Sequence, residues 1–236
     1  RCEMRTKFVA VFAVLAVFAI LMLIGCATMG KKMMGDTTPI KYDATAPVFV
    51  VGGMLESDRE LLESFAKGIP GSIPVFPDRI LPLSTAADTL YLQILKIMEE
   101  KGIVGPIILV AGSWTGLFGR ILTNQHPELV LAIITVGSPA GGYPEFVNNF
   151  FFGTKDQDCE VPLYVIASDG DWVVSPNAAL DLGRRKISDK KVFSGIGHFA
   201  LFKSLEVAQT INGWIQKETA KREAAKALLA VSAVIK

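Results

Sequence analysis

Four short apolar runs constrain what this chain can fold into. They cover residues 48–51 (VFVV), 107–110 (IILV), 131–136 (LAIITV) and 163–167 (LYVIA), and none contains a charged residue. Strands this uninterrupted have no side that faces water, so both faces of the sheet they form must be covered. Segments with helical periodicity separate the runs, which is typical of parallel strands joined by crossover helices. We therefore predict an α/β fold with a mostly parallel central sheet and helices on both faces.

The helical segments carry their own boundary signals. Ser57, followed by Glu60 three residues later, forms a capping-box pattern ahead of an apolar periodicity. The periodicity of residues 89–101 stops at Gly102, a residue suited to the position after a helix. Two further amphipathic patterns cover residues 175–186 and 202–215. With the strands, these segments fill residues 47–215, which we assign to one domain.

The first 26 residues have the pattern of a targeting segment rather than that of a folded domain. A basic head precedes a charge-free apolar run over residues 8–24, as in a secretory signal peptide. The run ends in Leu-Ile-Gly-Cys26, which resembles the lipobox of bacterial lipoproteins and implies lipidation of Cys26 after cleavage. An uncleaved transmembrane anchor is the alternative, because a run of this length reaches the lower edge of a membrane span. In both interpretations the domain is held outside the cytoplasm, in the cell envelope. Ala27 after the cysteine resembles lipoproteins of the outer membrane.

Two segments flank the predicted domain. Residues 27–46 are small, polar and irregular, which suits a flexible tether. Residues 216–236 are rich in Ala and Lys, and we expect them to extend the last helix and then fray. Contact of this tail with a membrane surface is the alternative.

Composition excludes several classes of function. The 24 basic and 23 acidic residues give a formal net charge of +1, which argues against an electrostatic grip on nucleic acid. Cys159 is the only cysteine after the lipobox, so no disulfide framework is expected. No CxxC or histidine-rich spacing indicates a metal, and residues 68–73 lack the lysine of a phosphate-binding loop. We expect a monomer without a cofactor.

Ser113 lies in the stretch AGSWTG, directly after one apolar run and before a segment that can be helical. A nucleophile turn needs this strand-turn-helix context and small neighbours, and its usual pattern is Gly-x-Ser-x-Gly. Here Ala111 and Thr115 occupy the two glycine positions, although Gly112 and Gly116 lie close by. The stretch alone therefore leaves two roles open for Ser113, a nucleophile or an ordinary turn residue.

Candidate partners for Ser113 are few. The chain has two histidines. His126 precedes a proline in a predicted surface turn, whereas His198 follows a glycine-containing segment at a predicted strand end. Asp169 and Asp171 follow the run at 163–167, where a carboxylate can accept the Nδ1 proton of a histidine. Either aspartate could instead form the turn around the intervening glycine.

The order of these residues resembles the α/β-hydrolase superfamily, whose triad runs nucleophile, acid, histidine. The stretch Asp171-Trp-Val-Val matches the family's acid loop and selects Asp171 over Asp169, while IITVGSPAGG at 133–142 resembles the strand and turn that follow the nucleophile helix. The resemblance implies Ser113 as nucleophile, His198 as base and Asp171 as acid. It also implies an oxyanion hole from the backbone N–H groups of Trp114 and of Met54, in VVGGM after the first run.

The resemblance also implies a substrate class. The interval 137–162, where relatives carry a cap, is too short for a helical cap domain, so we expect an open site or one covered by a short loop that includes residues 150–152. Small lidless lipases and esterases have this arrangement, which implies a hydrolase of carboxylic esters, and the lipobox at Cys26 implies that it is membrane-tethered. A catalytically inactive binding module and an acyltransferase are the alternatives.

Overall fold

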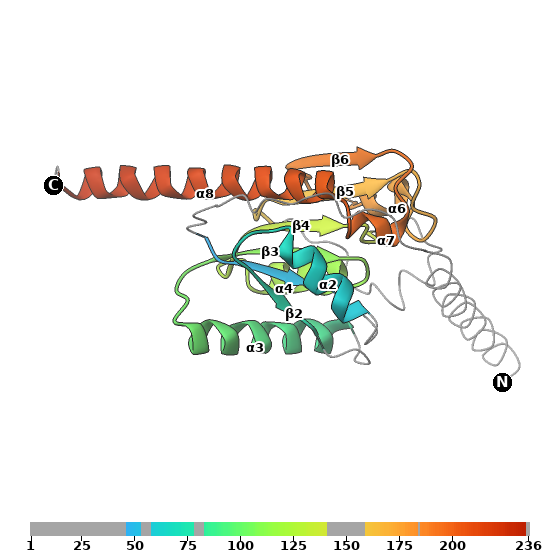
Figure 1. The fold of residues 1–236 in the computed structure, drawn as a ribbon. Coiled ribbons are helices and arrows are strands. Elements are labelled where there is room, and N and C mark those ends of the chain that lie inside the picture. Colours follow the sequence, from blue (N-terminus) through green and yellow to red (C-terminus); the bar gives the residue numbers. More distant parts are fainter. Residues whose placement is uncertain (1–45, 53–57, 78–82, 141–158, 184, 235–236) are drawn as a thin grey trace, which may run out of the picture. The chain divides into compact units, whose positions relative to one another are not determined.

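The computed structural model describes residues 46–52, 58–77, 83–140, 159–183 and 185–234 (Figure 1). Several predicted features lie outside these residues: the signal segment with Cys26, the tether up to residue 45, Met54, the capping residue Ser57 and the aromatic run 150–152. All statements below concern the described residues.

Six parallel strands form one sheet. They are β1 (Val48–Val51), β2 (Ser72–Val75), β3 (Ile107–Gly112), β4 (Val130–Val136), β5 (Leu163–Ser168) and β6 (Asp189–Phe193). Their order is β2-β1-β3-β4-β5-β6, and every neighbouring pair is parallel. The prediction of a mostly parallel sheet is therefore confirmed.

The two strands that the sequence did not indicate, β2 and β6, are the edges of the sheet. β2 reads SIPV and β6 reads DKKVF. An edge strand tolerates a proline because one row of its backbone N–H groups has no ladder partner, and it tolerates charges because one side faces water. Neither strand therefore carries the unbroken apolar run that marks the buried strands.

The described helices are α2 (Asp58–Lys67), α3 (Leu83–Lys101), α4 (Thr115–Gln125), α6 (Pro176–Leu180), α7 (His198–Leu201) and α8 (Leu205–Val234). The helix predicted for 89–101 begins earlier, at Leu83. The one predicted for 175–186 was wrong in length, because it ends at Leu180 and Gly183 takes a positive φ of 60° soon after. The helix predicted for 202–215 begins later, because residues 202–204 form a turn after α7 and α8 starts at Leu205, from where it continues to Val234.

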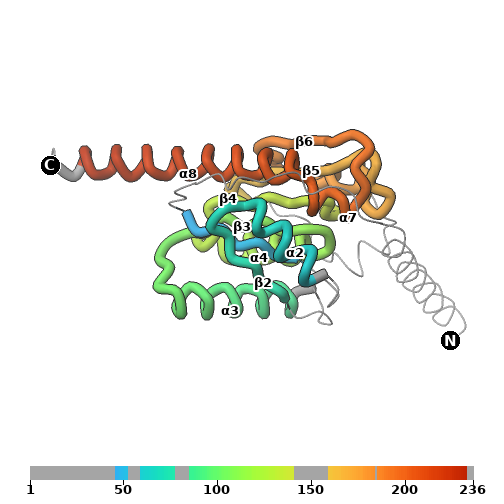
Figure 2. Tube along the Cα trace, viewed as in Figure 1, coloured from blue at the N-terminus to red at the C-terminus, as the bar shows by residue number. Residues whose placement is uncertain are grey.

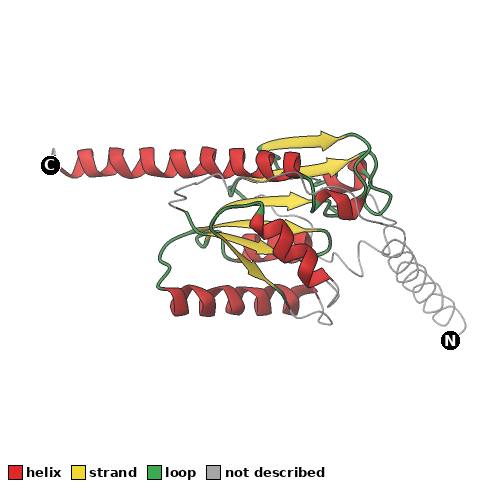
Figure 3. Ribbon diagram, in the orientation of Figure 1, coloured by secondary structure: helices red, strands yellow, loops and turns green. Residues whose placement is uncertain are grey.

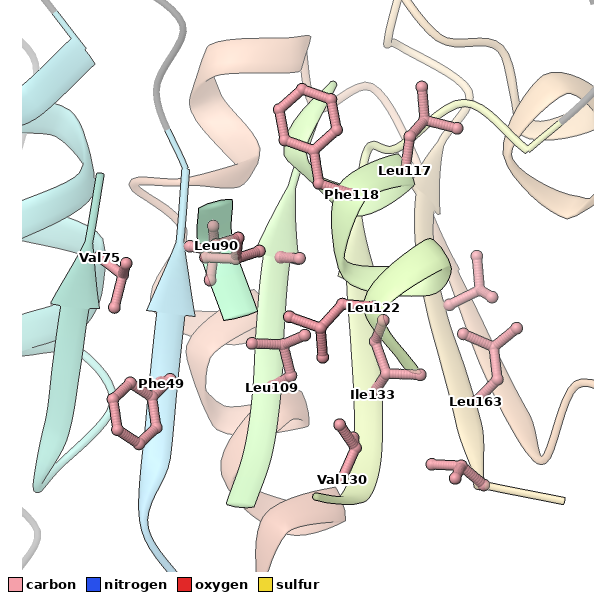
Figure 4. Close-up of a cluster of buried hydrophobic side chains, with 14 of the residues drawn as sticks. Phe49, Val75, Leu90, Leu109, Leu117, Phe118, Leu122, Val130, Ile133 and Leu163 are labelled. Atoms are coloured by element: carbon pink, nitrogen blue, oxygen red, sulfur yellow. The ribbon is translucent and has the colours of Figure 1, made fainter. Parts of the chain in front are cut away.

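Helices cover both faces of the sheet (Figure 3). One face packs against α3, α4 and α6 in a cluster where Leu122 of α4 lies between Leu109 of β3 and Ile133 of β4 (Figure 4). The other face packs against α2, α7 and α8. Successive residues of a strand point to opposite faces, so Phe49 belongs to the first cluster and Val50 to the second. Burial on both faces accounts for the unbroken apolar runs.

The path of the chain creates a switch point between β1 and β3. From β1 the chain crosses to β2 on one side, then returns through α3 to place β3 on the other side (Figure 2). The helices that leave the two strands lie on opposite faces of the sheet there, and in open parallel sheets such a switch point is where ligand sites usually form. Val51 ends β1 at this point and Gly112 ends β3.

Polar contacts join α8 to the sheet. The Tyr164 hydroxyl of β5 donates a hydrogen bond to the Glu218 carboxylate, which also lies 2.7 Å from the Lys221 ammonium group. The Trp214 indole N–H donates to Asp189 of β6 at 3.1 Å. Burial, together with the hydrogen bond and negative charge of Glu218, raises the pKa of Tyr164 well above its usual range. The tyrosine therefore stays a neutral donor to a buried carboxylate.

The last part of α8 is apolar and exposed. Leu228, Leu229 and Val231 are each more than half exposed. Within the described part of the chain, no helix has both the length and the apolar character needed to cross a membrane.

Candidate active site

Ser113 occupies the turn between β3 and α4, with a φ of 51°. No other described residue except glycine has a positive φ. Such a backbone costs about 1–2 kcal/mol for a residue with a Cβ atom. The Ser113 N–H is fixed by a 2.8 Å hydrogen bond to the Val136 carbonyl at the end of β4. The neighbouring strand thus helps to hold the serine in this strained turn at the carboxyl edge of the sheet.

Glycines at two nearby positions make the turn sterically possible. A Cβ atom on Gly112 would lie 2.3 Å from the Phe202 ring, and one on Gly116 would lie 2.1 Å from Ser138 Oγ. Real Cβ atoms do not approach other atoms so closely, so these neighbours would have to move. The required glycines therefore lie one residue before and three residues after Ser113, rather than two residues away on each side.

Thr115, the departure from the usual pattern, fits the turn. Its side chain is almost fully buried, and its hydroxyl lies 2.7 Å from the Gly112 carbonyl and 3.0 Å from the Val51 carbonyl. The second glycine position of the Gly-x-Ser-x-Gly pattern therefore holds a side chain whose polar atom has partners in the turn and in β1.

His198 begins α7, and Gly197 precedes it in an extended conformation. Its Nε2 lies 2.9 Å from Ser113 Oγ and its Nδ1 lies 2.7 Å from Asp171 Oδ2. The residue is 1% exposed, and its ring meets the Phe202 ring edge to face. Burial and aromatic packing therefore hold the imidazole between the serine and the carboxylate, 85 residues from Ser113 along the chain.

Asp171 and Asp169 have different partners. Oδ1 of Asp171 accepts 2.8 Å hydrogen bonds from the N–H groups of Val173 and Val174, which leaves Oδ2 for His198. Asp169 instead accepts from the Ser194 hydroxyl at 3.0 Å and from a backbone N–H in the same loop. The structure brings Asp171 to the histidine, and Asp169 joins the end of β5 to the loop after β6.

Gly137 is a site residue that the sequence analysis did not identify. It follows β4 with a φ of 51°. A Cβ atom there would lie 3.2 Å from Asp171 Oδ2 and 3.4 Å from His198 Cε1. Its place in GSP, directly after a buried strand, was the available signal. That a side chain there would crowd the acid and the histidine is visible only in the folded chain.

The remaining sequence candidates take no part in the hydrogen-bonded chain of Ser113, His198 and Asp171, or lie outside the described residues. Trp114 follows Ser113 and is partly buried against the core, whereas Met54 lies outside the described residues. His126 follows α4, where it stacks on Tyr91 at a centroid separation of 3.7 Å. Cys159 is a free thiol with its sulfur 3.7 Å from a backbone carbonyl of α4. Among the residues with described positions, no three His, Cys, Asp or Glu side chains cluster as metal ligands do.

These distances define the chemistry that the site can perform. A histidine with Nδ1 bonded to a carboxylate presents a lone pair on Nε2, provided that Nδ1 carries the proton. That lone pair faces the Ser113 hydroxyl, so the ring can accept its proton as the oxygen attacks an electrophile. The buried Asp171 carboxylate would then stabilise the imidazolium ion.

No protein-family model and no curated protein matches this sequence. Similar solved structures exist. Est1E from Butyrivibrio proteoclasticus has a TM-score of 0.58 at 12% identity, and the match covers 75% of this chain and 90% of that chain. A thermophilic esterase from Thermogutta terrifontis has a TM-score of 0.56 at 13% identity, covering 75% and 91%. An alpha/beta hydrolase enzyme from the metagenome of sediments from the lagoon of Mar Chica, Morocco, has a TM-score of 0.52 at 20% identity, covering 73% and 91%. At these identities the likeness concerns the backbone, and it shows that the chain has the α/β-hydrolase fold.

Proposed function

We propose that this protein is a serine hydrolase that cleaves carboxylic esters through an acyl-enzyme intermediate. The observation that carries the proposal is the continuous hydrogen-bonded chain from Ser113 through His198 to Asp171 at the carboxyl edge of the sheet. One of the similar folds belongs to a protein described as an esterase, the Thermogutta terrifontis enzyme, which supports the choice of esters. The strained backbone at Ser113 is a further support, because such strain persists where the surrounding structure fixes a functional group.

The reaction would proceed in two halves. Ser113 Oγ attacks the ester carbonyl carbon while its proton passes to His198 Nε2, and collapse of the tetrahedral intermediate returns that proton to the leaving alcohol. In the second half, His198 takes a proton from water, whose oxygen attacks the acyl carbon. Collapse then releases the carboxylic acid and restores the Ser113 hydroxyl. Asp171 keeps the proton on Nδ1 throughout.

The negative charge of each tetrahedral intermediate needs donors. We assign these to the backbone N–H groups of Trp114 and Met54. Trp114 directly follows the nucleophile, and Met54 follows the strand β1 that lies beside β3. A donor of this kind contributes about a hundredfold to a thousandfold in rate, because it is directed at the charge that develops in the transition state.

Substitution of the nucleophile tests the reaction. Ser113→Ala should abolish hydrolysis of p-nitrophenyl butyrate and labelling by a fluorophosphonate probe, while the circular dichroism spectrum and thermal midpoint stay close to those of the parent. Ser204→Ala is a suitable control, because that serine caps the start of α8 and lies outside the proposed site. The proposal is wrong if Ser113→Ala keeps its activity. A parent protein that folds but is neither labelled nor active would instead support the binding module, and transfer of the acyl group to an added alcohol would support the acyltransferase.

The membrane tether is a second part of the proposal. Lipidation of Cys26 would hold the catalytic domain at the cell envelope, where it meets esters at or near a lipid surface. Cys26→Ala should abolish incorporation of radiolabelled palmitate during expression in a bacterial host. Continued labelling of that variant would exclude Cys26 as the lipidated residue.

A further inference from the structure

The Thr115 hydroxyl lies where the carboxyl ends of two strands meet. It is 2.7 Å from the carbonyl of Gly112, the last residue of β3, and 3.0 Å from the carbonyl of Val51, the last residue of β1. Val51 is separated from Thr115 by 64 positions in the sequence. One buried hydroxyl therefore spans the switch point of the sheet directly beneath the nucleophile turn.

A second threonine in the same helix shows what is unusual about this contact. Thr123 is fully buried in α4, and its hydroxyl donates to the Gly119 carbonyl at 2.6 Å. Threonines in helices commonly make such bonds to their own preceding turn. Thr115 makes the equivalent bond to Gly112 and also reaches β1. Only the contact with Val51 joins two parts of the fold.

From this geometry we propose that Thr115 is a positioning residue. Its hydroxyl proton, shared between two carbonyl oxygens, adds to the pairing of β1 with β3 at the point where that pairing ends, and so fixes the end of β1 relative to the Ser113 turn. The inference rests on the proposed function, because β1 leads into the segment assigned to supply the second oxyanion donor and Ser113 supplies the nucleophile. The two groups that act on one carbonyl would then be kept in register by a side chain that touches neither substrate nor histidine.

Removing the hydroxyl proton has a defined physical consequence. Valine has the same shape as threonine but presents a methyl group, so the carbonyls of Gly112 and Val51 would lose their shared donor in a buried site. Both oxygens carry partial negative charge, so we expect the turn to shift relative to the end of β1 when their shared donor is removed. Because misplacement of reacting groups by about 1 Å costs roughly a hundredfold in rate, we expect a loss in kcat of about tenfold to a hundredfold.

The experiment compares three variants of the full chain with the parent. Thr115→Val removes the hydroxyl, Thr115→Ser keeps it, and Thr123→Val removes a buried hydroxyl whose hydrogen bond lies within α4. Each is measured for kcat and KM with p-nitrophenyl butyrate at several pH values, with the active fraction counted by fluorophosphonate titration and the thermal midpoint recorded. Thr115→Ala is added because its smaller side chain avoids any strain that valine introduces.

The expected result is a lower kcat per active site for Thr115→Val and Thr115→Ala, with KM and the shape of the pH profile close to those of the parent. Thr115→Ser should recover most of the rate, and Thr123→Val should keep it within about twofold, whatever its thermal midpoint. Full activity in Thr115→Val, no recovery in Thr115→Ser, or an equal loss in Thr123→Val would overturn this inference and leave the proposed function standing. An inactive, unlabelled parent would overturn both.

Discussion

Replacement of Gly137 with alanine separates backbone strain from damage to the catalytic geometry. Gly137 has a φ of 51°, where a residue with a Cβ atom is destabilised by about 1–2 kcal/mol. Gly71 has a φ of 73°, and a Cβ atom added there would meet no heavy atom within 4 Å, so Gly71→Ala introduces strain alone. For a domain of this size, each kilocalorie per mole lowers the thermal midpoint by roughly 2–4 °C. Both variants should therefore lose stability through strain, and Gly137→Ala should lose somewhat more because its Cβ atom also meets close neighbours.

Their activities should differ. The new methyl group on residue 137 would lie 3.1 Å from Leu201 Cδ1 and 3.2 Å from Asp171 Oδ2, closer than a comfortable contact, so both the leucine and the carboxylate must yield by a few tenths of an ångström. That oxygen holds His198 Nδ1 at 2.7 Å, so the imidazole would shift with it. Scaled from roughly a hundredfold per ångström, the loss in kcat/KM is about threefold to tenfold.

The assay measures kcat/KM for p-nitrophenyl butyrate and the free energy of unfolding by urea titration for both glycine variants. Gly137→Ala should lose stability and activity, and Gly71→Ala should lose stability alone. If Gly137→Ala is destabilised yet fully active, the contact with Asp171 has no catalytic consequence. If Gly71→Ala loses as much activity as Gly137→Ala, strain rather than local geometry controls the rate.

Two further predictions concern buried polar groups. Asp171→Asn should lower kcat by about ten-thousandfold, because an amide no longer keeps the proton on Nδ1 of the histidine. Asp169→Asn should reduce stability with little change in kcat. Equal losses of kcat in the two variants would argue against the assignment of Asp171 as the acid. Tyr164→Phe should destabilise the fold by about 1–3 kcal/mol, because the buried Glu218 carboxylate loses a donor. The pKa of Tyr164 is raised in the folded state, so its contribution to stability is complete below the unfolded value of about 10 and declines as the pH rises above it. Urea titrations between pH 8 and pH 11 should therefore show a steeper alkaline loss of stability in the parent than in Tyr164→Phe, and equal slopes would contradict this reasoning.

The strands and helices could be predicted from the sequence only where burial produces a local pattern of apolar residues. The runs at β1, β3, β4 and β5 are unbroken because both faces of those strands are covered, and they predicted the parallel sheet correctly. The edge strand β6 has four exposed residues out of five and carries no such pattern. The helix predicted for 175–186 shows the opposite error, because amphipathic spacing continued past Leu180 where the backbone leaves the helical conformation.

The candidate site could likewise be predicted only in part from the sequence. The sequence by itself supplied the candidate residues, because the chain has two histidines, Ser113 lies between a buried strand and a helical segment, and two aspartates follow another buried strand. It could not determine the distances between residues that are 85 and 27 positions apart in the chain, since these depend on how parallel strands place their carboxyl ends at one edge.

Thr115 and Gly137 illustrate what only the tertiary structure decided. In the sequence Thr115 is a departure from a glycine pattern, and Gly137 is one glycine in a turn. In the fold the threonine hydroxyl reaches the end of β1, and the glycine leaves room for the Asp171 carboxylate beside His198. Local periodicity records which side of an element is buried, but it holds no information on which atoms meet across the sheet. Those contacts follow from the order and register of the strands, which depend on packing between segments that are far apart in the sequence.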